Sequence, residues 1–153
     1  MSRILVIHHS QSGKTARLAE ETARGVRSIE GAVCLAKHAS QAGLEDLLHC
    51  DGILIGSPEY FGYMAGIIKD FFDRTYEDAR KHQEIFKKPY ALFISAGNDG
   101  AQAALSIERI CLGYPFKKVA APVIIKGEPG AEDLKACFEL GGAMAAGCGL
   151  GIF

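Results

Sequence analysis

Short runs of apolar, largely β-branched residues recur along this chain without a polar residue to interrupt them. The clearest are Ile4–Ile7, Ile53–Ile55, Tyr90–Ile94 and Val119–Ile125, and Ala32–Ala36 is a weaker fifth. A strand with one solvated face alternates apolar and polar residues, whereas a strand covered on both faces does not. These runs therefore predict strands of a parallel sheet that is buried on both sides.

Helical spacing separates the runs. Apolar residues recur three and four positions apart within Leu18–Val26, Met64–Tyr76, Ala104–Cys111 and Leu134–Met144, and Leu44–Leu48 is a shorter, poorer stripe. Five strands that alternate with five helices predict an α/β three-layer sandwich, a five-stranded parallel sheet with helices on both faces. The glycines and alanines from Gly141 to Phe153 predict that the last helix fades into a loose tail.

Length and charge narrow the classes of function. A chain of 153 residues predicts a single domain over residues 1–153. Its 17 basic and 18 acidic residues nearly cancel, which argues against general binding to nucleic acid or to anionic lipid. No apolar run approaches the roughly 18–20 residues of a membrane span, and the first residues lack a signal peptide, so we expect a cytoplasmic protein. Five cysteines without a C-x-x-C pair predict reduced thiols and no metal cluster.

The loop after the first strand, Ser10–Thr15, combines three hydroxyl side chains with Gly13 at the start of a helix. Backbone N–H groups and the helix dipole favour an anion at such a helix end, and hydroxyls add further donors. We therefore predict a phosphate site here. The alternative is an ordinary N-cap made by Ser10 or Ser12. The loop is not a Walker A sequence, because His8 stands where that motif requires glycine.

A second loop, Gly56–Tyr63, follows the central strand and carries three aromatic residues. A flat aromatic ligand could stack there. The sequence favours a ligand contact for Tyr60, whereas core packing is an equal alternative for Phe61. The third loop, Ser95–Gly100, is small and rich in glycine, and its alternative is a strand-to-helix turn capped by Asn98 or Asp99.

The three loops should converge, because the carboxyl ends of parallel strands meet at one edge of a sheet and ligands bind there. A phosphate at the first loop and a ring between the other two describe a mononucleotide. At the end of the first strand, His8 and His9 are expected to pack behind this site, not to bind metal.

The loop sequences resemble a known superfamily. Ser10-x-Ser12-Gly13-x-Thr15 is similar to the S/T-x-S/T-G-x-T phosphate loop of the flavodoxins. Gly56–Met64 resembles the corresponding segment of Wrb-type NAD(P)H:quinone oxidoreductases and NADPH-dependent FMN reductases, and Lys87–Gln102 is similar to a later stretch of the same family. The resemblance implies a flavodoxin-like fold with strand order 2-1-3-4-5 and noncovalently bound FMN.

The resemblance also implies the residues of the cofactor site, and it implies no catalytic side chain and no metal. The phosphate would be held by Ser10, Gln11, Ser12, Gly13, Lys14 and Thr15. The isoalloxazine ring would be flanked by Pro58, Glu59, Tyr60, Phe61 and Gly62 and by Ser95, Ala96, Gly97, Asn98, Asp99 and Gly100.

The implied activity is the transfer of electrons from NADH or NADPH, through FMN, to a quinone or similar acceptor. The cofactor supplies this chemistry, and the fold positions it. The implied partners are a small-molecule donor, a small-molecule acceptor and further copies in a homodimer or homotetramer. The main alternative is a flavodoxin-type electron carrier between proteins. The near-zero net charge argues against it, because such carriers are usually strongly acidic.

Overall fold

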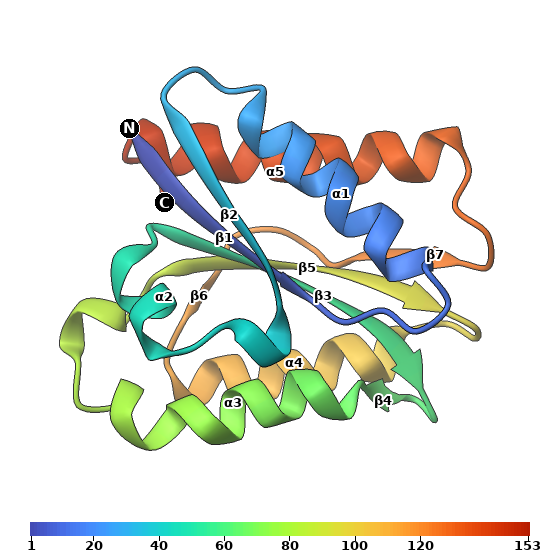
Figure 1. The fold of residues 1–153 in the computed structure, drawn as a ribbon, viewed down its shortest axis with the longest axis horizontal. Coiled ribbons are helices and arrows are strands. Elements are labelled where there is room, and N and C mark those ends of the chain that lie inside the picture. The colour runs from blue at the N-terminus through green and yellow to red at the C-terminus, as the bar shows by residue number, and fades with distance from the viewer.

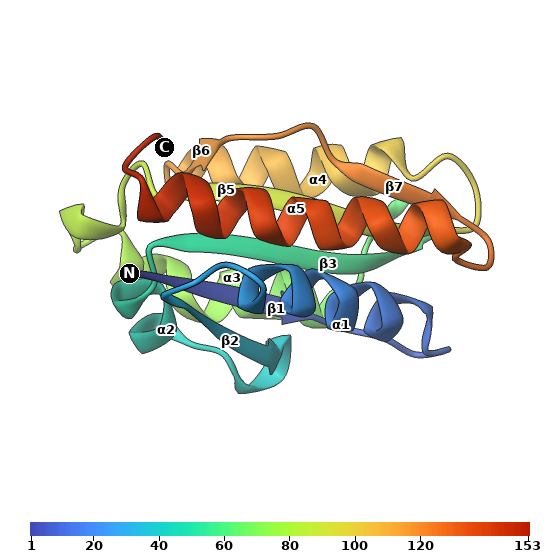
Figure 2. The ribbon, with the colours of Figure 1, turned by 90° about the horizontal axis from the view of Figure 1, so that it is seen from above.

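The computed structural model describes all residues 1–153 as a central sheet between two helical layers (Figure 1). Helices α1 (Lys14–Arg27) and α5 (Ala131–Gly149) cover one face, where Figure 2 looks down on them. The opposite face is covered by α3 (Gly66–Ala79) and α4 (Ala101–Gly113), with the short α2 (Leu44–His49) beside them. The flavodoxin-like α/β class predicted from the sequence is thus confirmed.

The sheet has seven strands in the order β2-β1-β3-β5-β6, with β4 added to β3 and β7 added to β5. The strands are β1 (Ser2–His8), β2 (Ala32–His38), β3 (Gly52–Tyr60), β4 (Tyr63–Met64), β5 (Pro89–Ala96), β6 (Lys117–Lys118) and β7 (Val123–Lys126). Only β4 is antiparallel to its neighbour. Short 3-10 turns lie at Ala39–Gln41 and Gln83–Ile85.

The predicted count of five strands in the order 2-1-3-4-5 was therefore wrong. Of the last predicted strand, Val119–Ile125, only the end forms a strand, as part of β7, because Pro122 lacks the N–H that a continuous ladder requires. The additional strand β6 lies just before Val119, and both β6 and β7 pair with β5. The additional strand β4 begins where the chain reverses at the end of β3, so Met64 lies in a strand and not in the predicted helix.

Alternate residues of the apolar runs enter two separate cores. Leu5 and Ile7 of β1 belong to the core under α3 and α4, together with Phe71. Ile4 and Val6 belong to the core under α1 and α5. Because successive side chains of a strand point to opposite faces, each uninterrupted run contributes to both cores. The prediction of a sheet buried on both sides is confirmed.

The last helix does not fade at Gly141, as the sequence predicted, but continues to Gly149. Beyond it the chain turns back, and the Ile152 N–H donates to the Gly147 carbonyl oxygen at 2.9 Å. None of the helices combines the length and the apolar character needed to cross a membrane. All five cysteines are free thiols.

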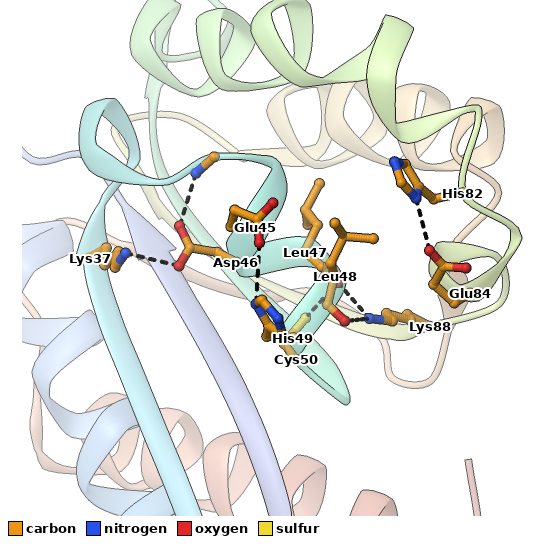
Figure 3. A network of polar contacts seen from close by, with 11 residues as sticks. Lys37, Glu45, Asp46, Leu47, Leu48, His49, Cys50, His82, Glu84 and Lys88 are labelled. Carbon is orange, nitrogen blue, oxygen red and sulfur yellow. Dashed lines mark hydrogen bonds and ion pairs between the residues drawn. The ribbon is translucent and has the colours of Figure 1, made fainter.

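The six-residue helix α2 is held at both ends by charged side chains, as Figure 3 shows. At its start, Asp46 accepts a hydrogen bond from the Gly43 N–H at 2.9 Å and pairs with Lys37 at 2.8 Å. At its end, the Lys88 ammonium donates to the carbonyl oxygens of Leu47 and Leu48. These are carbonyl groups that a helix end leaves without partners.

Replacing Lys88 by methionine should remove this cap while it keeps most of the apolar stem. We expect the free energy of unfolding to fall by about 1–3 kcal/mol, because two carbonyl groups lose a charged donor. Urea denaturation measures the change. Lys81→Met is the matched control, since Lys81 is exposed and makes only a 3.5 Å contact with Asp78. Equal losses in the two variants would contradict the capping role.

Candidate functional site

Three loops lie side by side at the carboxyl edge of the sheet, after β1, β3 and β5. The strand register fixes this arrangement, because His8 is paired with Gly56 and Gly56 with Phe93. The His9 N–H also donates to the Gly56 carbonyl oxygen at 3.3 Å, beyond the last residue of β1. The first loop precedes α1, the second forms the β3–β4 hairpin, and the third precedes α4.

The first loop ends in a helix start that no side chain caps. Gly13 takes a φ of 97°, a left-handed conformation that favours glycine, and its N–H donates to the Ser10 hydroxyl at 3.1 Å. The first bond within the helix runs from the Arg17 N–H to the Gly13 carbonyl oxygen. The N–H groups of residues 14, 15 and 16 thus have no acceptor in the protein. The interpretation as an ordinary N-cap does not account for them.

The chemistry of this loop fits a phosphate group. Thr15 is buried, yet its hydroxyl forms no hydrogen bond with the protein, and Ser12 presents a second free hydroxyl at the surface. Lys14 and Arg17 lie 4.0 Å and 3.8 Å from Glu128, in the loop after β7. Free N–H groups at a helix start, free hydroxyls and nearby cations are the donors that a phosphate dianion requires.

The second loop is a tight hairpin turn that projects an aromatic ring into solvent. Tyr60 pairs with Tyr63, and between them Phe61 and Gly62 take φ values of 52° and 70°. Two positive φ values are typical of a type I′ turn. Phe61 is fully exposed, so it does not pack in the core. Tyr60 is half-buried, and its hydroxyl donates to the Gln11 side-chain oxygen at 2.9 Å, which joins the second loop to the first.

The third loop is tied to the second by Glu59. One carboxylate oxygen of Glu59 accepts the Asn98 N–H at 2.8 Å, and the other accepts the Gly100 N–H at 3.0 Å. Asp99 accepts the Ala101 N–H at 3.0 Å just before α4, although the N-cap residue of this helix is Gly100, which offers no side-chain cap. Nothing in the protein occupies the space beside the α-carbon of Gly97. The three loops thus form one connected frame around an open edge.

The predicted site residues range from buried to exposed. Thr15 and Gly100 are buried at the helix starts, and the partly buried ones are Ser10, Lys14, Glu59, Tyr60 and Gly62. Pro58, Ser95 and Ala96 are buried in β3 and β5, where Pro58 is paired with Ser95. The exposed members are Gln11, Ser12, Gly13, Phe61, Gly97, Asn98 and Asp99. The sequence did not single out Ser57 as a positioning residue, although its hydroxyl accepts the Ala65 N–H at 2.9 Å and so anchors the hairpin. The sequence signal that could have identified Ser57 is a hydroxyl residue directly after a buried apolar strand run.

A groove of about 690 Å³ begins at the hairpin and runs along α4. Tyr63 lines one end, and Leu105 and Leu112 of α4 line its exposed wall. Its volume lies within the range of small-molecule sites. The groove touches the three-loop frame only at Gly62 and Tyr63, so it is a neighbour of the frame and not its centre.

Removing the charge of Glu59 should loosen the third loop. We expect Glu59→Gln to lower the free energy of unfolding by about 1–2 kcal/mol, because one N–H loses its carboxylate acceptor. Hydrogen exchange at the Asn98 and Gly100 amides should accelerate more than exchange elsewhere. Glu128→Gln is the control, since Glu128 is exposed and pairs only at long distance. Unchanged exchange at both amides would contradict this role of Glu59.

Comparison with known proteins gives a consistent picture. The family model described as NADPH-dependent FMN reductase matches residues 26–123. A flavodoxin of Aquifex aeolicus (strain VF5) is 34% identical over 161 residues, which cover 95% of this chain and 86% of that protein. An NAD(P)H dehydrogenase (quinone) of Acidithiobacillus ferrooxidans (strain ATCC 53993 / BNL-5-31) is 38% identical over 95 residues, 49% of this chain and 48% of that protein.

A solved structure shares the fold. The flavodoxin, WrbA-like protein from Agrobacterium tumefaciens superposes with a TM-score of 0.83 at 21% identity, over 98% of this chain and 99% of that one. At this identity the likeness establishes the architecture, namely a sheet with helices on both faces and loops at its carboxyl edge.

Proposed function

This chain belongs to the NADPH-dependent FMN reductase family, and on that premise we propose that it is an FMN-dependent oxidoreductase that passes electrons from NAD(P)H to a quinone or similar acceptor. The observation that carries the proposal is the uncapped start of α1, with three free N–H groups and the unbonded hydroxyl of Thr15. FMN, when bound, supplies the redox chemistry of the flavin ring.

The first loop would hold the phosphate. The N–H groups that begin α1 point along the helix axis toward the loop, where the helix dipole favours negative charge. Ser10, Ser12 and Thr15 would donate hydroxyl bonds, and Lys14 would add a cation. Gly13 allows the turn that brings these donors together, and Gln11 is held in place by Tyr60.

The second and third loops would hold the ring. Tyr60, Phe61 and Gly62 form one wall and Gly97–Gly100 the other, with Pro58, Ser95 and Ala96 as the buried base between them. Glu59 fixes the separation of the walls through its two bonds to the third loop. No side chain of this frame needs to act as an acid or nucleophile, because hydride transfer to and from a flavin does not require one.

A second function, electron carriage between proteins, is favoured by one observation. The relative that matches nearly the whole chain at 34% identity is called a flavodoxin. Against it stands the net charge of −1, since charge steering of a protein partner usually relies on a strongly charged surface.

Steady-state turnover distinguishes the two functions. The protein loaded with FMN, given NADH or NADPH and a soluble benzoquinone, should oxidise the nicotinamide continuously without a partner reductase. Heat-denatured protein with the same FMN is the control for free flavin. If no turnover occurs but the bound flavin accepts electrons from a separate flavoprotein reductase, the carrier function is correct and the enzyme function is wrong.

A further inference from the structure

Three histidines gather beside the first loop, outside the residues assigned to FMN. His8 is the last residue of β1, His9 follows it and adjoins the loop directly, and His38 ends β2 opposite His8 in the strand register. The His9 Nδ1 and the His38 Nε2 lie 2.9 Å apart, within hydrogen-bond distance. The His8 and His38 ring centres are 6.0 Å apart. This histidine cluster does not have the arrangement of a metal-binding set.

The hydrogen bonds define where the protons lie. The Ser40 N–H donates to His38 Nδ1 at 3.3 Å, so this nitrogen is an acceptor in the neutral ring. His38 then carries its proton on Nε2 and donates it to His9 Nδ1. The proton of His9 is consequently on Nε2, and this N–H has no acceptor in the protein.

The cluster is coupled to the first loop through Tyr60. The His9 and Tyr60 rings meet edge to face with centres 6.4 Å apart, and the Tyr60 hydroxyl binds Gln11 of the loop. His9 is also covalently next to Ser10, whose hydroxyl organises the loop. A charge placed on the pair is therefore linked, through His9 and Tyr60, to the loop that would hold the phosphate.

No anion of the protein faces the histidine cluster. The groups around it are the neutral side chains of Tyr60 and Ser40, and the Lys37 ammonium is already paired with Asp46. The Glu128 carboxylate, near the start of α1, lies by Lys14 and Arg17. Burial lowers the pKa of His8 and of His9, and the nearby His38 lowers both further. The buried Nδ1 of His8 also has no partner.

We propose that His9 and His38 are a proton-accepting part of the phosphate site, which takes up a proton from solvent when the FMN phosphate enters the first loop. The inference rests on the proposed function and adds two residues and a proton to it. The proton would enter at His38 Nδ1, where the Ser40 hydroxyl, 2.6 Å away, changes from donor to acceptor and the Ser40 N–H gives up its 3.3 Å bond to this nitrogen. The bond from His38 Nε2 to His9 stays intact, and the dianion supplies the negative charge that the cluster lacks.

The direction of the pH dependence follows from linkage. In the protein without FMN, the unfolded chain protonates His8 and His9 near pH 6.5, whereas the folded chain does so only at lower pH. The unfolded state then binds more protons, so stability without FMN should fall as the pH drops through about 6.5. A bound dianion favours the charged imidazole instead, so FMN affinity should rise over the same range.

Titrations with FMN and riboflavin, followed by flavin fluorescence, test this proposal. Between about pH 8 and pH 6.5, above the pH at which a phosphate monoester itself takes up a proton, the dissociation constant of FMN should tighten about three- to tenfold. That of riboflavin, which lacks the phosphate, should not change. Calorimetry in two buffers of different ionisation enthalpy should show net proton uptake when FMN binds and none when riboflavin binds.

Variants make the assignment specific. His38→Gln and, independently, His9→Gln should flatten the pH dependence of FMN affinity, whereas His49→Gln, at an exposed position of α2, should keep it. Melting curves show whether each variant is folded. FMN binding with a flat pH profile, or an equal profile for riboflavin, would overturn this inference but not the proposed function. Failure to bind FMN at every pH would overturn both.

Discussion

Replacement of Ser12 and Thr15 together by alanine is expected to weaken FMN binding by at least about a hundredfold. Each hydroxyl is a donor that the protein leaves free, and a hydrogen bond to a charged group contributes about 1.5–3 kcal/mol. Two such bonds amount to two or more powers of ten in the dissociation constant. Titration of the protein with FMN, followed by loss of flavin fluorescence, measures the effect.

The same variant should fold normally, because neither hydroxyl is bonded within the protein. Thr15 is buried, so its alanine variant removes one methyl group as well, a modest loss of apolar contact. The matched control is Ser28→Ala with Ser106→Ala, two hydroxyls that donate to carbonyl oxygens of their own helices or helix ends, far from the loop. FMN affinity that is unchanged in the Ser12 and Thr15 variant would refute the phosphate assignment.

Much of the fold was predictable because it depends on patterns that are local in sequence. The runs around Ile4–Ile7 and Tyr90–Ile94 have no polar residue, which leaves only strands covered on both faces as an interpretation. The strand break at Pro122 has a local signal, because proline cannot donate a ladder hydrogen bond. The true length of α5 could not be predicted from local patterns. Helix propensity disfavours Gly141, and this glycine is required by its close contact with α1, which is a tertiary property.

The site was predictable as a set of loops and not as a set of contacts. The parallel sheet brings three loops to one edge whatever their sequence, and hydroxyls before a helix indicate an anion. The two bonds of Glu59 join residues about forty positions apart in the chain, and no local pattern encodes them. The pairing of His9 with His38 depends on the register of β1 with β2, which is likewise a tertiary property.

Gly141→Ala is expected to lower the free energy of unfolding by about 3 kcal/mol, although alanine is the better helix former. A Cβ at this position would collide with the Thr22 carbonyl oxygen, which is backbone of α1 and cannot rotate away. The neighbour Gly142 gives the matched control, because its Cβ would meet the Gly25 carbonyl oxygen at 3.5 Å and Ile29 Cδ1 at 4.0 Å, both ordinary contacts.

Gly142→Ala should therefore stabilise the protein by about 0.5–1 kcal/mol through helix propensity alone. For a chain of this size the loss in Gly141→Ala corresponds to a melting temperature lower by about 6–12 °C. The free energy of unfolding should thus fall in Gly141→Ala and rise in Gly142→Ala. Helix propensity alone cannot produce opposite changes at two adjacent glycines of one helix. Melting temperatures that rise in both variants would show that α1 and α5 can separate at little cost, and that Gly141 is not required for their close approach.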